Sequence, residues 1–548
     1  MMQKTLLLSV MVCWTSASWA QDSAKKYWVY LNESAVDFSQ PMLGPDALSR
    51  RSAQGIALQT SDFALQQSAV TAVNRVADVV GRSRWLRAVV VRANDTQIAQ
   101  LKSLPEVSSL QPVGIMKRSL TELQVPLSPD SMDDIKGLAP DAASPKPSSE
   151  EEGIQTYQYG ASLAQVTQIQ LDVLHDAGFD GAGVKIALMD GGYAGAESYS
   201  AFVGAWQQGR VLGTWDYVDG DSNVFHLGSH GMSVWSTICS DLDGTFVGTA
   251  PKASFYLFKT ENQATETIAE EYHWVMAAER ADSLGVDVIN TSLGYTTFDN
   301  GIDDHGYADM DGRSTPISIA AVAAARTGMI LCISAGNEGS SSWKYISAPA
   351  DADSILAVGA VDQFGIRAGF SSQGPSFDGR IKPDVAARGL GAAVMNSNGQ
   401  VATSSGTSFS SPIMAGAMAS LVQAAKMLPN GYSAQNLIQR VRLSASQAFA
   451  PDSFLGYGIP NFATVYNGLG LNSAPVIHPW VLNQSNDGAW ILRRMDLRSS
   501  DRLDYFAADG RLIQSFEVAQ GQAEVRLEPQ SFYGFVRSKT QVLPVAPR

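Results

Sequence analysis

Apolar residues in the middle of the chain form short continuous runs that alternate with stretches of helical spacing. Residues 184–189, 255–258 and 329–333 are apolar at nearly every position, which is typical of strands covered on both faces. Residues 270–284 and 317–326 carry apolar positions at helical spacing. The alternation predicts an α/β domain with a parallel sheet and helices on both faces. We assign this domain to residues 153–470.

The N-terminal part of the chain follows a different pattern. Strand-like runs at 27–31, 85–91 and 107–113 surround a segment with helical spacing at 96–104. We expect a separate small α+β domain over residues 21–117.

The C-terminal part, residues 471–548, contains short β-like runs separated by Gly and Asp-Gly turns. We expect a small antiparallel β-sandwich there. The runs lie at 490–492, 503–506, 512–516, 523–527 and 532–536.

The first 20 residues have the composition of a secretory signal peptide. Lys4 precedes a short apolar run at 5–12, and small residues stand at positions 18 and 20. The run is too short to cross a membrane, and no later stretch approaches a transmembrane length. We therefore expect a secreted or cell-surface protein without a transmembrane segment.

Residues 118–152 are rich in proline and serine and include the acidic run 150–152. This composition favours an extended, exposed linker, where chains are easily cleaved.

The composition of the chain argues against nucleic acid as a partner, and its cysteines indicate neither a disulfide framework nor a zinc site. The chain has 548 residues, 45% hydrophobic and 17% charged, with a formal net charge of −14, so several globular domains are expected and nucleic acid is not. Cys239 and Cys332 show no disulfide framework; two buried free thiols are the favoured interpretation and a pair between them the alternative. CxxC and HExxH are absent, so zinc has no motif support.

Ser408 is the first candidate for chemistry, because it lies where a Gly-flanked loop enters the Ala-rich run 413–419. Free N–H groups at a helix start can stabilise a developing oxyanion. A serine that only caps the helix is the alternative.

Three further residues follow predicted strands or stand in Gly-flanked loops. Asp190 follows the strand at 184–189, His230 lies in SHGMSV, and Asn337 lies in SAGNEG after the strand at 329–333. Ligands of open parallel sheets bind beyond the carboxyl ends of the strands. Each residue alone also suits a turn or a structural role.

The order Asp190, His230, Ser408 on an α/β chain is the order of the subtilisin triad. Together with ALMDGGY, SHGMSV, NTSLG, SAGNEG and GTSFSSP, it makes residues 153–470 resemble the subtilisin-like serine peptidases. The resemblance implies that Ser408 is the nucleophile, His230 the general base, and Asp190 its orienting partner. It further implies that Asn337 stabilises the oxyanion. The implied substrate-binding residues are Ser292, Leu293 and Gly294.

The resemblance also implies roles for the flanking parts. Residues 25–117 look like an inhibitor-type propeptide that assists folding and covers the cleft, with self-cleavage in the linker. The C-terminal residues resemble a type IX secretion sorting domain, which would involve secretion machinery; an adhesive or stabilising β-module is the alternative.

Two residues near the triad differ from the family's usual pattern. Gly191 stands where a Ser or Thr is common, and Met232 replaces a polar residue. No cofactor is expected. Family members often bind structural calcium, but 219–223 fails the EF-hand pattern at Val224, so a calcium site stays unplaced.

The sequence therefore predicts a secreted serine endopeptidase made as a proenzyme, acting on protein or peptide substrates. An α/β-hydrolase-type esterase is the enzymatic alternative, but it requires a G-x-S-x-G motif that the chain lacks. A binding protein on an inactive peptidase scaffold is the alternative outside enzymes.

Overall fold

The computed structural model describes residues 25–112, 157–299, 301–429 and 431–471, together with seven short strands between 481 and 545. The predicted signal peptide and the linker at 118–152 lie outside these residues.

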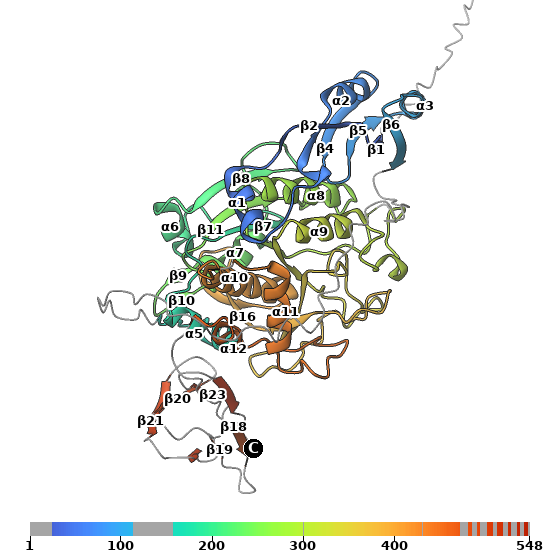
Figure 1. The fold of residues 1–548 in the computed structure, drawn as a ribbon. Helices are drawn as coiled ribbons and strands as arrows, with labels where there is room; N and C mark the ends of the chain where they lie inside the picture. Colours follow the sequence, from blue (N-terminus) through green and yellow to red (C-terminus); the bar gives the residue numbers. More distant parts are fainter. Residues whose placement is uncertain are drawn as a thin grey trace, which may run out of the picture.

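A seven-stranded sheet forms the centre of the molecule (Figure 1). Its order is β15-β14-β13-β12-β7-β11-β8, and all neighbouring pairs are parallel. This confirms the predicted parallel sheet. The strands are β7 (Lys185–Asp190), β8 (Val211–Asp216), β11 (Ser254–Lys259), β12 (Val288–Thr291), β13 (Ile330–Ser334), β14 (Leu356–Val361) and β15 (Val385–Arg388).

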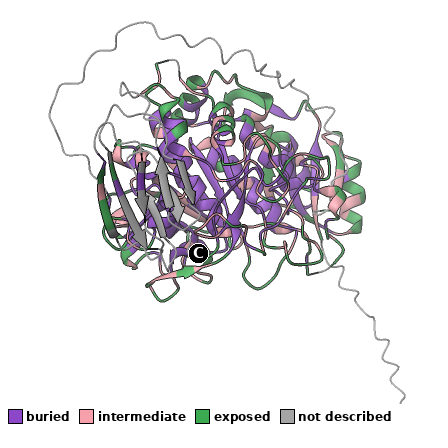
Figure 2. Cartoon of the chain, turned by 90° about the horizontal axis from the view of Figure 1, so that it is seen from below, coloured by how far each residue is buried: buried purple, intermediate pink, exposed green. Residues whose placement is uncertain are grey.

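Helices cover both faces of this sheet, and β7 shows why its sequence is continuously apolar. Ile186 and Leu188 belong to one core, with α7 (His230–Cys239) and α10 (Thr407–Ala425). Ala187 and Met189 belong to the opposite core, with α8 (Ala269–Ser283) and α9 (Pro316–Arg326). Successive side chains of a strand point to opposite faces, so a doubly covered strand needs apolar residues throughout. Figure 2 shows the buried residues concentrated in this region.

Shorter elements complete this domain. The helices are α4 (Leu163–Thr167), α5 (Asp172–Asp176), α6 (Ser200–Gln207), η4 (Tyr307–Asp309), α11 (Ala434–Ser444) and α12 (Phe462–Asn467), and two small antiparallel pairs join β9 (Asp241–Leu242) to β10 (Phe246–Val247) and β16 (Ala392–Met395) to β17 (Val401–Ser404).

The N-terminal domain is a four-stranded antiparallel sheet of order β4-β5-β1-β6 with two helices. Its elements are β1 (Lys25–Leu31), α2 (Gln67–Asn74), β4 (Asp78–Ser83), β5 (Ala88–Ala93), α3 (Asp95–Lys102) and β6 (Val107–Pro112). Val89 and Val91 face the domain's own core. Ala88 and Val90 instead share the core that contains α8 and α9. The sheet is therefore covered on one side by the central domain.

One strand boundary differs from the prediction. The apolar run at 85–91 was expected to be a single strand, but β5 begins at Ala88, and residues 84–87 form a turn. Trp85 and Leu86 are apolar because they are buried in the core shared with α8 and α9.

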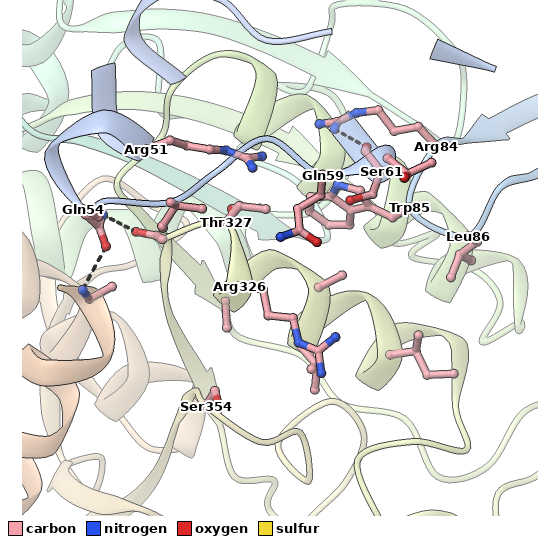
Figure 3. Close-up of a pocket in the computed structure, with 18 of the residues that line it drawn as sticks. Arg51, Gln54, Gln59, Ser61, Arg84, Trp85, Leu86, Arg326, Thr327 and Ser354 are labelled. Carbon is pink, nitrogen blue, oxygen red and sulfur yellow. Dashed lines mark hydrogen bonds between the residues drawn. The ribbon is translucent and has the colours of Figure 1, made fainter. Parts of the chain in front are cut away.

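Residues 36–65 of the N-terminal domain extend along the central domain, and we call this segment the helical arm. It contains β2 (Val36–Pro41), α1 (Pro45–Ala53), η1 (Thr60–Asp62) and β3 (Phe63–Leu65). Gln54, just after α1, donates to Gly328 O and accepts from Ala434 N, at 2.8 and 2.9 Å. A cavity of about 700 Å³ lies between the arm and the central domain. Figure 3 shows residues that line it. The arm thus contacts the central domain around a cavity rather than as one continuous packed surface.

The C-terminal strands form two antiparallel sheets. One has the order β18-β19-β22 and the other β21-β20-β23-β24. The predicted packing of these sheets into a sandwich stays a prediction. The strands are β18 (Val481–Gln484), β19 (Trp490–Arg493), β20 (Asp501–Ala507), β21 (Leu512–Val518), β22 (Glu524–Leu527), β23 (Gly534–Arg537) and β24 (Val542–Val545).

Two smaller predictions are settled by the fold. Cys239 and Cys332 are both buried free thiols, so the alternative of a disulfide between them is wrong. Among the described residues, no helix is both long and apolar enough to span a membrane.

Candidate active site

Asp190 is the last residue of β7, an interior strand of the sheet between β12 and β11. Its side chain is buried, and Oδ1 accepts a hydrogen bond from Gly191 N at 2.7 Å. The same oxygen lies 2.7 Å from His230 Nδ1. Oδ2 is buried and has no hydrogen-bond partner among the described residues. The carboxylate is therefore held by one oxygen, between the turn that follows β7 and the imidazole.

His230 is the first residue of α7. Its side chain keeps 43% of its surface exposed although Nδ1 faces Asp190. The negative charge of Asp190 raises the pKa of His230 above its ordinary value; burial opposes this, and Glu261 adds to it. The ring centroid of Phe409, next to Ser408 in the chain, lies 6.0 Å from that of His230. The structure thus brings His230 beside Asp190 and beside the start of α10.

Ser408 is the second residue of α10, and the N-cap residue of this helix is Gly406. The alternative that Ser408 caps the helix is therefore wrong. Its hydroxyl donates to Ser292 O at 3.4 Å, while Ser292 Oγ donates to Ser408 O at 2.9 Å. In this conformation the hydroxyl therefore points to Ser292. A rotation about the Cα–Cβ bond would turn it away from Ser292, and catalytic hydrogen bonds are often long before substrate binds.

Asn337 follows β13 and is oriented by Thr407. Its Oδ1 accepts from Thr407 N at 2.9 Å and from Thr407 Oγ1 at 3.0 Å. Thr407 Oγ1 also accepts from Gly336 N at 3.2 Å. Because Oδ1 is occupied, the amide Nδ2 of Asn337 is the group left to donate to a ligand. Thr407 was not singled out from the sequence, although it immediately precedes Ser408.

The segment of Ser292, Leu293 and Gly294 follows β12 and is held on both sides. Ser334 Oγ donates to Leu293 O at 3.2 Å. A Cβ added to Gly294 would lie 2.1 Å from Ser347 Oγ. Glycine at this position therefore allows close approach of Ser347, which the sequence analysis did not identify.

The structure adds Glu261 to the neighbourhood of the site. Its Oε1 accepts hydrogen bonds from Tyr295 at 2.6 Å and from Thr260 at 2.8 Å. Burial raises its pKa to about 8, with a further contribution from Asp190. The sequence signal that could have pointed to Glu261 is its position shortly after the apolar run at 255–258, since ligands of open parallel sheets bind beyond the strand ends.

Two groups of acidic or histidine side chains among the described residues have ligand atoms within 4.8 Å of one another. In the group of Asp216, Asp219 and His226, Lys259 Nζ lies 2.7 Å from Asp216 and neutralises it, so this group does not fit a cation. Glu261, Glu266 and Glu270 offer carboxylate oxygens, the donor type that calcium prefers. At 219–223 the side chains of Asp221 and Asn223 accept backbone N–H bonds, as expected for a turn.

Comparison with known proteins agrees with this arrangement. Residues 181–458 match the subtilase family, and residues 26–128 match the peptidase S8 propeptide domain of Bacteroidota. Subtilisin E of Bacillus subtilis is 31% identical over 317 residues, covering 57% of this chain and 73% of the relative. Subtilisin DY of Bacillus licheniformis is 32% identical over 311 residues, covering 56% and 97%.

The central domain, with its parallel sheet and Asp190–His230 pair, is that of a serine-type endopeptidase. The chain belongs to the subtilase family and carries a propeptide domain N-terminal to its peptidase domain.

Proposed function

We propose that this chain is a secreted serine endopeptidase, made as a proenzyme, that cleaves peptide bonds with Asp190, His230 and Ser408. The observation that supports this best is the 2.7 Å contact between His230 Nδ1 and Asp190, next to the start of α10. The contact orients the imidazole so that Nε2 is the nitrogen free to accept a proton.

In the proposed mechanism, His230 Nε2 takes the hydroxyl proton as Ser408 Oγ attacks the peptide carbonyl carbon. Asn337 Nδ2 and the backbone N–H of Ser408 donate to the resulting oxyanion. His230 then gives the proton to the leaving amine, which leaves an acyl-enzyme on Ser408. A water molecule, deprotonated by His230, releases the acid in the same way.

Ser292, Leu293 and Gly294 are proposed to bind an extended substrate along their backbone and to form a wall of the first specificity pocket. The cleavage chemistry uses side chains and backbone alone, and we propose no cofactor. For a structural calcium ion, Glu261, Glu266 and Glu270 are the described residues with a suitable donor set; the ion would neutralise them.

The N-terminal domain is proposed to act as an intramolecular inhibitor until the linker at 118–152 is cut. Its sheet already shares a core with α8 and α9 of the peptidase domain. For residues 471–548 we propose a role in type IX secretion; removal of these residues should leave the protein in the periplasm if this is correct, and unchanged export would contradict it.

Labelling with a fluorophosphonate tests the assignment of Ser408. The processed protein should be labelled at Ser408, and both labelling and hydrolysis of casein should be lost in Ser408→Ala. Ser397→Ala is a matched control, because the contact of Ser397 in the structure uses its backbone carbonyl. A binding protein on an inactive scaffold would show neither labelling nor hydrolysis in the wild type.

A further inference from the structure

Gly191, in the turn after Asp190, has no side chain, and the side chain of Gln263 occupies the space beside it. A Cβ built on Gly191 would lie 2.3 Å from Nε2 of Gln263 and 3.6 Å from Cβ of Glu261. Gly191 does not have a positive φ, so its backbone conformation does not call for glycine. The space beside Gly191 is instead filled by the amide of Gln263, which comes from the loop between β11 and α8.

The same amide also contacts the loop that carries His230. Gln263 Nε2 donates to Gly191 O at 3.1 Å. A Cβ built on Gly228 would lie 2.9 Å from Gln263 Cδ and 2.6 Å from Gly191 O. One side chain therefore touches the turn next to Asp190 and the loop two residues before His230.

We propose that Gln263, an exposed residue, is a positioning residue for the Asp190–His230 pair, and that it holds the Asp190 turn and the His230 loop in their relative positions. The inference rests on the proposed function. Gln263 acts through the backbone of Gly191 and the glycine Gly228, and it donates no proton to the reacting atoms.

Other hydrogen bonds also join the Asp190 turn to the His230 loop, and they limit how much kcat should fall when Gln263 is removed. Ala194 N donates to Gly228 O at 2.9 Å, and Tyr193 N donates to Val224 O at 2.9 Å. Gln263 adds one hydrogen bond to this set, and a typical hydrogen bond is worth about a two- to ten-fold change in an equilibrium or rate. We therefore expect a reduction in kcat of about two- to ten-fold when Gln263 is removed.

The first test compares Gln263→Ala, Gln263→Leu and the control Gln400→Ala in the enzyme after processing. The probe is a peptide p-nitroanilide chosen by profiling a peptide library with the wild type. Gln400 is a matched control, because it is exposed and its hydrogen bonds in the described part of the structure use only its backbone. Gln263→Ala should lower kcat with KM unchanged, Gln263→Leu should recover only the part of the loss that is due to side-chain volume, and Gln400→Ala should match the wild type.

The pH profile is the readout that a merely structural role would not move. The negative charge of Asp190 is the main cause that raises the pKa of His230. If Gln263→Ala loosens the Asp190 turn, the acidic limb of kcat/KM should shift to lower pH, because the imidazolium loses part of its stabilisation. An unchanged limb together with an unchanged kcat would overturn the inference.

The second test is a double-mutant cycle with Gly191→Ala. The added methyl group occupies the position of the Gln263 amide and should displace it, so Gly191→Ala should lower kcat as Gln263→Ala does. The two changes together should lower kcat no further than either alone. Additive losses would show that the two positions act independently, and a change confined to KM would show that Gln263 contacts substrate instead.

The proposed function and this inference fail in different ways. A wild-type enzyme without hydrolysis or Ser408 labelling contradicts the function. An active wild type whose Gln263→Ala variant has the kcat and pH profile of Gln400→Ala contradicts only the role of Gln263. Thermal unfolding of every variant separates misfolding from loss of positioning, and Gly191→Ala keeps the test valid if Gln263→Ala unfolds.

Discussion

At the residue scale, the site consists of side chains whose orientation is set by their neighbours. Thr407 donates two hydrogen bonds to the side-chain oxygen of Asn337, so the amide nitrogen of Asn337 is the atom that can donate to a ligand. Asp190 holds Nδ1 of His230 and leaves Nε2. In both cases a hydrogen bond at one end of a side chain decides which atom can meet the substrate.

The pH dependence of activity follows from the pair of His230 and Asp190. His230 must be neutral to accept a proton, and Asp190 raises its pKa above the ordinary 6.5. Activity should therefore fall as the pH drops through a value above 6.5, measured as kcat/KM between pH 4 and 9. Activity that stays constant down to pH 4 would contradict the role of His230.

Removal of the amide donor at position 337 should slow the chemical step. Asn337→Ala is expected to reduce kcat by about 10²–10³ with little change in KM, the size of effect known for such a donor in this family. Steady-state kinetics on a peptide p-nitroanilide measure it. Asn396→Ala is a control, because Asn396 bonds only to its own turn. Equal kinetics for the two variants would remove Asn337 from the mechanism.

At the scale of elements, the helical arm joins the propeptide domain to the peptidase domain through buried charges. Asp282 near the end of α8 contacts Arg50 and Arg51 of α1, and Arg84 at 2.7 Å. Arg51 also bonds both oxygens of Asp62. Burial alone would raise the pKa of Asp282, but the three arginines outweigh it and hold this pKa below its usual range. The carboxylate is therefore a shared anchor of the two domains.

Breaking this anchor should destabilise the precursor. In the Ser408→Ala background, Arg51→Ala leaves Asp62 and Asp282 with less compensation in a buried interface. We expect a loss of about 3–5 kcal/mol in the apparent free energy of unfolding, measured by denaturant titration. Arg82→Ala, at an exposed arginine of the same domain, should cost less than about 1 kcal/mol. Similar losses for both variants would mean that the arm is not an anchor.

At the scale of the whole molecule, the chain combines a propeptide domain, a peptidase domain and a strand-rich C-terminal part. The propeptide sheet is covered on one face by its own helices and on the other by α8 and α9. Separation of these domains would expose apolar residues of both. The two domains should therefore stay associated after the chain is cut, until the propeptide is degraded.

Self-processing can be tested on the complete precursor. Ser408→Ala should accumulate at full precursor length, whereas the wild type and Ser397→Ala should be cut between residues 118 and 152. Mass spectrometry and N-terminal sequencing measure the outcome. Normal processing of Ser408→Ala would show that another protease makes the cut.

Much of the fold and site could be predicted from the sequence because the signals are local. The apolar run that ends at Asp190 and the Gly-flanked loop of His230 are short patterns, and their order along the chain pointed to one family. The continuous apolar strands indicated a sheet covered on both sides, which the two cores confirm. Backbone sterics and strand periodicity determine such features within a few residues.

Only the tertiary structure decided which side chains share a space. The amide of Gln263 beside Gly191, Thr407 against Asn337, and the three arginines around Asp282 join residues that the sequence keeps apart. Trp85 and Leu86 lie in a turn and are buried in the core that contains α8. In the sequence they look like part of a strand because they are apolar. Apart from such boundaries, the sequence by itself determined where the strands, helices and chemical groups of the central domain lie along the chain, since these depend on neighbouring residues. Contacts between distant residues depend on how the elements pack, and no local pattern encodes them.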